Sequence, residues 1–236
     1  MTGIGENVAA MSGEERQRRA DAERNRQRLL DAAQELFRER GLEVGVGEIA
    51  EKAGVGRGTL FRNFPTKEDL IAAIVVLRMR DVSERGIALR DAADPDEALF
   101  ELLEHMAGEQ QINRSLFEAI ADAWLVNAEI RAGHVEVVGA VEGLLERAQA
   151  AGLVRRDVSA IDVLMLLKGV CEAAYSLSQI EPDIIQRHLD LIRAALAPDA
   201  KPARLRGRAP TLSDIEQAFP DIEEPPPVAA GTAGTV

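Results

Sequence analysis

Apolar residues recur at three- and four-residue spacing along most of the chain, which is the pattern of α-helices with one buried side. The first clear apolar stripe covers residues 29–37, within a helix expected at 24–40. Two short helices should follow at 46–53 and 57–64, with Gly54 in the turn between them. The pattern therefore predicts three helices in the N-terminal third, of which the last is about two turns long.

Helix start signals divide the rest of the chain. Thr66, with an acidic residue three positions later, and Asp94, followed by Pro95, have the character of helix N-caps. Further helices are expected from Thr66 to about residue 90, at 95–110, from 113 or 115 through Trp124, and at 128–151, 159–178 and 182–196. Alternating patterns typical of strands are hard to find, and only 3% of the residues are aromatic. The fold class is therefore expected to be all-α.

Composition divides the chain into four regions. Seven of the ten prolines lie after Ala197, so residues 198–236 are expected to form a flexible tail. Residues 1–20 are expected to form a flexible N-terminal arm, residues 21–67 a three-helix domain, and residues 68–197 a C-terminal helical bundle. The net charge of −12 is concentrated in the last two regions, because residues 1–67 contain 12 Lys and Arg against 11 Asp and Glu. An acidic chain can therefore still contact nucleic acid with its N-terminal third.

The sequence offers little for catalysis or for metal binding. A single cysteine, Cys171, excludes an intramolecular disulfide and a cysteine-based zinc site, and the three histidines are scattered. No catalytic constellation stands out, so no catalytic residue, metal or cofactor is expected, and the chain is not expected to be an enzyme. Neither a signal peptide nor a membrane span is recognisable, so a cytoplasmic location without a membrane partner is expected.

A helix-turn-helix motif fits residues 46–64. Such a motif needs a small residue where its helices cross, a glycine in the turn and apolar residues between the helices. Ala50 and Gly54 have the first two places. The internal apolar contacts are expected from Ile49, Val55 and Leu60. The motif predicts that the helix at 57–64 enters the major groove of double-stranded DNA.

The outward side of that helix carries residues suited to reading DNA. Arg can bind guanine bidentately, Asn can bind adenine, and Thr can contact the thymine methyl group or a phosphate. A glycine in the helix lets the backbone approach a phosphate, and a lysine at the next helix N-terminus favours a phosphate oxygen. The expected DNA contacts are Arg57, Gly58, Thr59, Phe61, Arg62, Asn63 and Lys67.

An arginine-rich run precedes the first apolar stripe, at residues 16–28. Its six arginines could contact phosphates or the minor groove. They alternate with acidic residues, so a merely solvated segment is an equal alternative.

Residues 24–75 resemble the DNA-binding domain of TetR-type repressors. LLDAAQELFRERG resembles the family's first helix, GEIAEKAGVGRGTLFRNF its helix-turn-helix, and PTKEDL the start of its fourth helix. The resemblance implies that Phe61, where tyrosine is common, and Lys67 lie against phosphates, Phe61 by packing alone. Gly45, Gly47 and Gly56 replace polar residues that are common at those positions, so backbone amides are the expected donors there.

The bundle is expected to pair with a second copy of the chain. Residues 161–177 are apolar on nearly every face and need cover on two sides. The TetR resemblance implies that the last two helices pair, which would set two reading helices near 34 Å apart on a palindromic operator. The expected interface residues are Leu164, Leu167, Ile185, Leu189 and Ile192. Burial of these residues inside one subunit is the alternative.

The same resemblance implies a cavity for a small-molecule effector among the fourth to eighth helices. The residues expected to line it, each of which could equally be plain core, are Met79, Leu102, Met106, Phe117, Trp124, Val137, Cys171 and Tyr175. The expected function is therefore a dimeric repressor that a small molecule releases from DNA. Two alternatives stay open: a ligand-independent DNA-binding regulator, and a helical carrier or enzyme that does not bind DNA.

Overall fold

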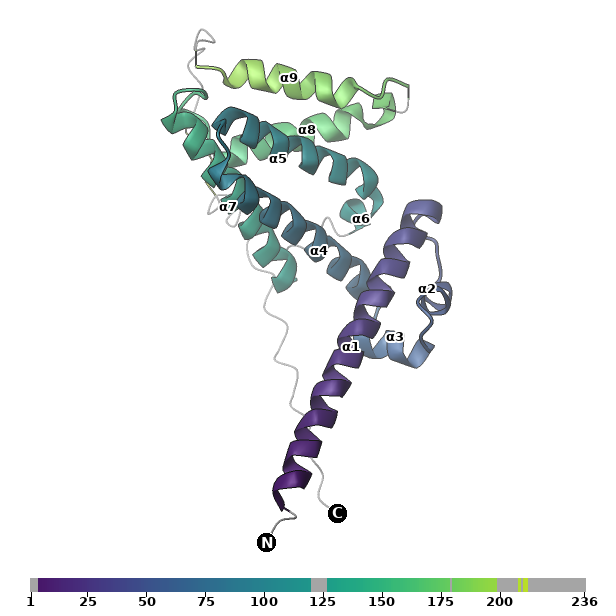
Figure 1. Cartoon of the computed structure of the whole chain (residues 1–236). Coiled ribbons are helices and arrows are strands. Elements are labelled where there is room, and N and C mark those ends of the chain that lie inside the picture. The colour runs from purple at the N-terminus through teal and green to yellow at the C-terminus, as the bar shows by residue number, and fades with distance from the viewer. Residues whose placement is uncertain (1–3, 120–126, 179, 199–207, 209, 212–236) are drawn as a thin grey trace.

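The computed structural model of the chain describes residues 4–119, 127–178, 180–198, 208, 210 and 211, with side chains described from Glu15 onwards. Within these residues the chain forms nine α-helices, one short 3₁₀ helix and no strand (Figure 1). The all-α prediction is therefore confirmed. Trp124 and nearly all of the predicted C-terminal tail lie outside the described residues. None of the described helices combines the length and the apolar composition needed to cross a bilayer.

The N-terminal domain consists of α1 (Ile4–Arg40), α2 (Val46–Lys52), α3 (Arg57–Asn63) and the first half of α4 (Lys67–Ala88). Its core is made of apolar side chains that are almost completely removed from solvent, among them Leu29, Ile49, Leu60, Phe64 and Ile74. The helix starts and ends follow the predicted ones closely, except at the beginning of α1.

Helix α1 begins at Ile4, which corrects the expectation of a flexible arm at residues 1–20. The residues between Glu14 and Arg28 are mainly Glu, Arg, Gln and Ala, which have high intrinsic helix propensity. Glu15 and Arg19 form an ion pair of 2.5 Å across one helical turn, and Asp21 pairs with Arg24. Local interactions therefore extend the helix where no apolar stripe predicted it.

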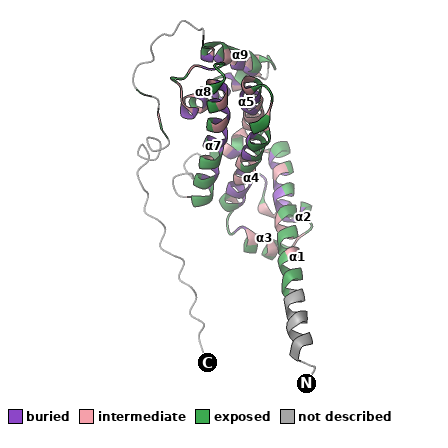
Figure 2. Ribbon diagram, turned by 60° about the vertical axis from the view of Figure 1, so that its left-hand side comes forward, coloured by how far each residue is buried: buried purple, intermediate pink, exposed green. Residues whose placement is uncertain are grey.

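Within the described residues, the C-terminal bundle consists of five helices, joined to α4 by the 3₁₀ turn η1 (Leu89–Asp91). These helices are α5 (Pro95–Ile112), α6 (Arg114–Ala119), α7 (Ala128–Ala150), α8 (Ala160–Ser178) and α9 (Ile184–Leu196). Helix α4 packs most extensively against α7, and α5 contacts α7, α8 and α9. Figure 2 shows that the buried residues of the bundle gather between these helices.

The predicted N-caps are confirmed. The Thr66 hydroxyl accepts a hydrogen bond of 3.0 Å from the Asp69 amide, and the Asp69 carboxylate accepts one of 2.9 Å from the Thr66 amide. The Asp94 carboxylate accepts hydrogen bonds from the amides of Asp96 and Glu97. These caps satisfy N–H groups that would otherwise lack partners at the starts of α4 and α5.

Helix α4 belongs to both cores. Leu70 and Ile74 pack in the N-terminal core, whereas Val82 packs in the core of the bundle. Gly86 lies so close to α7 that an added Cβ would be 2.8 Å from the Ala140 Cβ. Helix α4 therefore connects the N-terminal domain to the bundle as one continuous, tightly packed rod.

Candidate nucleic-acid interface

The turn between α2 and α3 has the geometry that the helix-turn-helix pattern predicts. Gly54 has a φ of +64°, a conformation that favours glycine, and the Val55 amide donates a hydrogen bond of 3.0 Å to the Ala50 carbonyl. Ala50 is 1% exposed at the helix crossing, where a larger side chain would not fit. Leu60, on the inner side of α3, is buried in the same core as Ile49.

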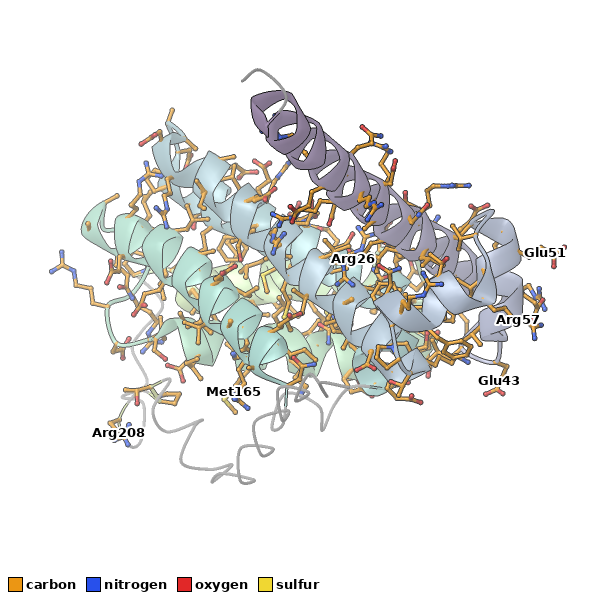
Figure 3. The ribbon with its side chains drawn as sticks, turned by 90° about the horizontal axis from the view of Figure 1, so that it is seen from below. Arg26, Glu43, Glu51, Arg57, Met165 and Arg208 are labelled. Atoms are coloured by element: carbon orange, nitrogen blue, oxygen red, sulfur yellow. The ribbon has the colours of Figure 1, made fainter. Side chains whose placement is uncertain are left out.

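The opposite side of α3 is exposed to solvent. Arg57, Gly58, Phe61 and Arg62 are exposed, and Thr59 is half-buried. Figure 3 shows Arg57 at the end of the molecule where Glu43 and Glu51 also lie. The Phe61 side chain, although apolar, is 48% exposed. These predicted reading residues therefore lie on one outward-facing surface.

Asn63 is placed differently from the other predicted reading residues. It is half-buried, and its side-chain amide donates a hydrogen bond of 2.8 Å to the Thr59 carbonyl in the same helix. To read adenine as expected, the side chain would have to give up this bond.

The three predicted glycines lie around the starts of α2 and α3. Gly45 and Gly56 are the extended N-cap residues of these helices. The Gly45 amide, predicted as a donor to DNA, donates a hydrogen bond of 3.2 Å to the Glu48 carboxylate instead. An added Cβ at Gly47 would lie 2.5 Å from a guanidinium nitrogen of Arg57, so the missing side chain leaves room for this arginine against α2. Arg40 forms an ion pair of 2.6 Å with Glu48, and this hydrogen bond lowers the pKa of the Glu48 carboxyl.

Lys67 has an internal partner. Its ammonium group donates a hydrogen bond to the Leu42 carbonyl and lies 5.8 Å from the centre of the Phe37 ring. Lys67 thus joins the start of α4 to the turn after α1. Its contact with a phosphate stays a prediction.

Two arginines of α1 also touch α3 or the turn before it. The Arg26 guanidinium lies 4.5 Å from the centre of the Phe64 ring at the end of α3, and Arg28 donates a hydrogen bond of 3.4 Å to the Gly54 carbonyl. Arg26 continues the helical stripe of Leu30, Ala33 and Phe37 by one turn, and this spacing is the signal that could have identified it.

The structure buries most of the residues predicted for the dimer interface within one protomer. Leu167, Ile185, Leu189 and Ile192 are core residues of the protomer, and Leu164 is half-buried against the same core. Other apolar side chains of the last two helices are exposed instead, namely Met165, Leu166, Leu177 and Leu191. Met165 is 62% exposed and points away from the helices in Figure 3. Periodicity alone could not separate these faces, because α8 is apolar on nearly all of them.

Most residues predicted to line an effector cavity pack in the cores. Leu102, Val137 and Cys171 are buried, and Met79 and Met106 are half-buried against the bundle core. Phe117 packs on the N-terminal core. Burial raises the pKa of the Cys171 thiol to about 11.

A narrow crevice lies between α8 and the α5–α6 corner. It is lined by Gln110, Gln111, Arg114, Cys171, Glu172 and Tyr175, and within the described residues it holds little more than a water molecule. The Arg114 guanidinium closes over the Tyr175 ring at 4.1 Å and forms an ion pair of 2.9 Å with Glu172. Cys171 and Tyr175 are thus the two predicted effector residues that share a crevice.

Comparison with known proteins relates both parts of the chain to one family. Residues 29–74 match the family described as bacterial regulatory proteins, tetR family, and residues 94–198 match the SbtR-like transcriptional regulator C-terminal domain. An HTH-type transcriptional regulator of Staphylococcus aureus is 43% identical over 58 residues, which are 24% of this chain and 31% of that protein. The chain thus spans about a third of the length of the curated relatives it matches.

Two solved structures are similar over most of the chain. A TetR transcriptional regulator from Streptomyces coelicolor has 30% identity and a TM-score of 0.59, and the similarity covers 74% of this chain and 99% of that one. A TetR transcription regulatory protein from Mycobacterium vanbaalenii has 32% identity and a TM-score of 0.58, covering 76% of this chain and 98% of that one. The chain therefore belongs to the TetR family of DNA-binding transcriptional regulators.

Proposed function

We propose that this regulator is a repressor that binds an inverted-repeat operator as a dimer and leaves it when a small molecule binds the bundle. One observation carries the proposal: α4 is packed into both cores, so a shift of α4 at the bundle end must be transmitted to the N-terminal domain. A ligand that prefers a shifted arrangement must weaken DNA binding by the same coupling free energy.

Contacts near the start of α4 support this transmission to α3. Lys67 is bonded to Leu42 in the turn before α2, and Leu70 shares the core that also buries Leu60 of α3. At the other end, α4 has no free space against α7, because Gly86 faces Ala140. A change in the packing of α4 on α7 would therefore reorient α3.

The exposed side of α8 supports the dimer. Met165, Leu166 and Leu177 are about half exposed or more, and Gly169 lies among them with open space in front of it. Apolar and small residues that gather on one helix face are suited to a second copy of the same face in a two-fold dimer. A dimer is needed because one two-turn helix contacts few base pairs.

The test of the release mechanism needs an operator. This operator is first obtained by selecting the sequences that the protein binds from a pool of random DNA duplexes. Resorcinol and triclosan are suitable first probes, since solved proteins of similar fold are complexes with these compounds. A larger set of compounds is then screened by thermal unfolding of the protein, and every compound that raises the Tm is included as a further probe. The proposal expects that a compound that raises Tm also lowers operator affinity, and by the same factor that the operator lowers the affinity for the compound.

A ligand-independent regulator is the second candidate, and the narrowness of the crevice beside Tyr175 favours it. The same titration separates the two. Compounds that bind the protein without changing operator affinity would reject the release mechanism and favour this alternative.

A further inference from the structure

Helix α1 begins well before the segment that matches the family's DNA-binding domain. The family match begins at residue 29, whereas α1 begins at Ile4. At 1.5 Å per residue, the additional 25 residues form a rod of about 37 Å, which is far longer than the roughly 12 Å width of a major groove. We name residues 15–28, whose side chains are described, the α1 projection. Figures 1 and 2 show that α1 extends beyond α3 at the end of the molecule opposite α8 and α9, and that the projection is exposed.

The α1 projection is fixed relative to the reading helix. Its last turn contacts the chain at both ends of α3. The Arg26 guanidinium stacks on the Phe64 ring directly after α3, and Arg28 donates a hydrogen bond to the Gly54 carbonyl in the turn before α3. A duplex that lies on the exposed side of α3 would therefore have the α1 projection beside it in a defined position.

The charge of the α1 projection favours a polyanion. It contains six arginines and three acidic residues, in a chain whose net charge is −12. Two of the acidic residues, Glu15 and Asp21, form ion pairs with Arg19 and Arg24. Arg16 and Arg18 are exposed and form no ion pair with any residue whose side chain is described.

The composition of the α1 projection disfavours a protein partner. Its only apolar side chains are those of Ala20 and Ala22. A helix that pairs with another helix needs larger apolar residues at repeating positions. Side chains of Arg, Gln and Asn are suited instead to phosphate and sugar oxygens.

We infer that the α1 projection is a second DNA-binding element, which lies along the sugar–phosphate backbone next to the base pairs read by α3. It binds without base preference and lengthens the protected site at its outer ends. This inference rests on DNA binding by α3.

The test compares two double variants with the same loss of charge. Arg16→Gln with Arg18→Gln removes two exposed arginines of the α1 projection, and Arg156→Gln with Arg187→Gln removes two exposed arginines of the bundle. Affinity is measured against salt on the selected operator with flanking base pairs and on the same operator trimmed to its core. Thermal unfolding and far-UV circular dichroism establish that each variant is folded.

The inference expects the first variant to lose affinity for the flanked operator at least tenfold, and to reduce the salt slope by about four, which is two for each protomer of the dimer. On the trimmed operator it should bind as the unmodified chain does, and the bundle variant should match the unmodified chain on both. An unchanged slope and affinity on the flanked operator would overturn the inference, and so would a gain of affinity, since the α1 projection would then hinder DNA. If the unmodified chain selects no operator, the failure is that of the proposed function.

Discussion

Gly58 lies on the exposed side of α3, where an added Cβ would have only one atom of Arg62 within 4 Å, at 3.8 Å. Within a helix, glycine costs roughly 0.5–1 kcal/mol relative to alanine. We therefore expect Gly58→Ala to increase the free energy of unfolding by about this amount, measured in urea. The same substitution should lower operator affinity, because its methyl group would stand between the α3 backbone and the DNA.

Gly139→Ala is the matched control for Gly58→Ala. Gly139 is exposed on α7, with nothing within 4 Å of an added Cβ, so alanine should stabilise the chain similarly and leave operator affinity unchanged. A Gly58→Ala variant that binds operator as tightly as the unmodified chain would show that the α3 backbone does not approach DNA there.

Cys171 is expected to react slowly with thiol reagents. Burial raises its pKa from 9.0 to about 11, so the thiolate fraction near pH 8 is about a hundredfold smaller than for an ordinary thiol. Labelling with a maleimide should therefore be slow in the native chain and fast in urea. Native labelling at the rate of free cysteine would mean that the bundle opens readily around α8.

At the scale of single residues, the sequence predicted the exposed side chains of Arg57, Phe61 and Arg62, but neither the half-buried Asn63 nor the internal partner of Lys67. Arg57, Phe61 and Arg62 follow from the helix period around Leu60. The bond from Lys67 to Leu42 joins residues 25 positions apart, and such a bond depends on how α1 and α4 cross. The spacing of residues along the sequence does not predict how these two helices cross.

The crossing of α4 and α7 gives a prediction at the scale of the element. A methyl group at Gly86 would lie 2.8 Å from the Ala140 Cβ and 3.3 Å from a Leu102 methyl carbon, so Gly86→Ala must push these helices apart. We expect a loss of roughly 1–3 kcal/mol in the free energy of unfolding. Operator affinity should also fall, although Gly86 is remote from α3.

Gly143→Ala is the matched control, because it makes the same glycine-to-alanine change in α7 at a position where an added Cβ meets open space. It should be neutral or stabilising, with unchanged operator affinity. If Gly86→Ala destabilises the chain but binds operator normally, α4 does not couple the bundle to DNA.

The elements were predictable where a helix has one apolar side and a capping residue. Thr66 and Asp94 marked the starts of α4 and α5, and the stripe from Leu29 to Phe37 marked the second half of α1. The first half of α1 escaped this approach, because its Glu, Arg and Ala residues form a helix through local propensity and need no core.

We expect assembly of the whole molecule to depend on the exposed side of α8. We expect Met165→Glu to place a charge in the dimer interface and to convert the chain to monomers, as measured by sedimentation velocity. Operator affinity should fall steeply with the dimer, since each protomer supplies one α3. Val135→Glu changes a 46% exposed residue of α7 in the same way and should leave the dimer intact. Persistence of the dimer in Met165→Glu would place the interface elsewhere.

The exposed face of α8 could not be predicted from the sequence, because α8 has apolar residues on both its sides. Leu167 packs inward, whereas the adjacent Leu166 is 47% exposed. Only the position of α9 and α5 against α8 distinguishes them, and that position follows from the packing of the whole bundle.

The central claim is that the exposed side of α3 reads the bases of an inverted repeat. Its most direct test is the selection of bound sequences from random duplexes, performed in parallel with the unmodified chain and with Arg62→Ala. We predict an inverted repeat for the unmodified chain, and loss of base preference at one pair of symmetry-related positions for the variant, at a cost of about 1–3 kcal/mol on the original operator. Identical base preferences in the two selections, or no enriched sequence with the unmodified chain, would contradict this account.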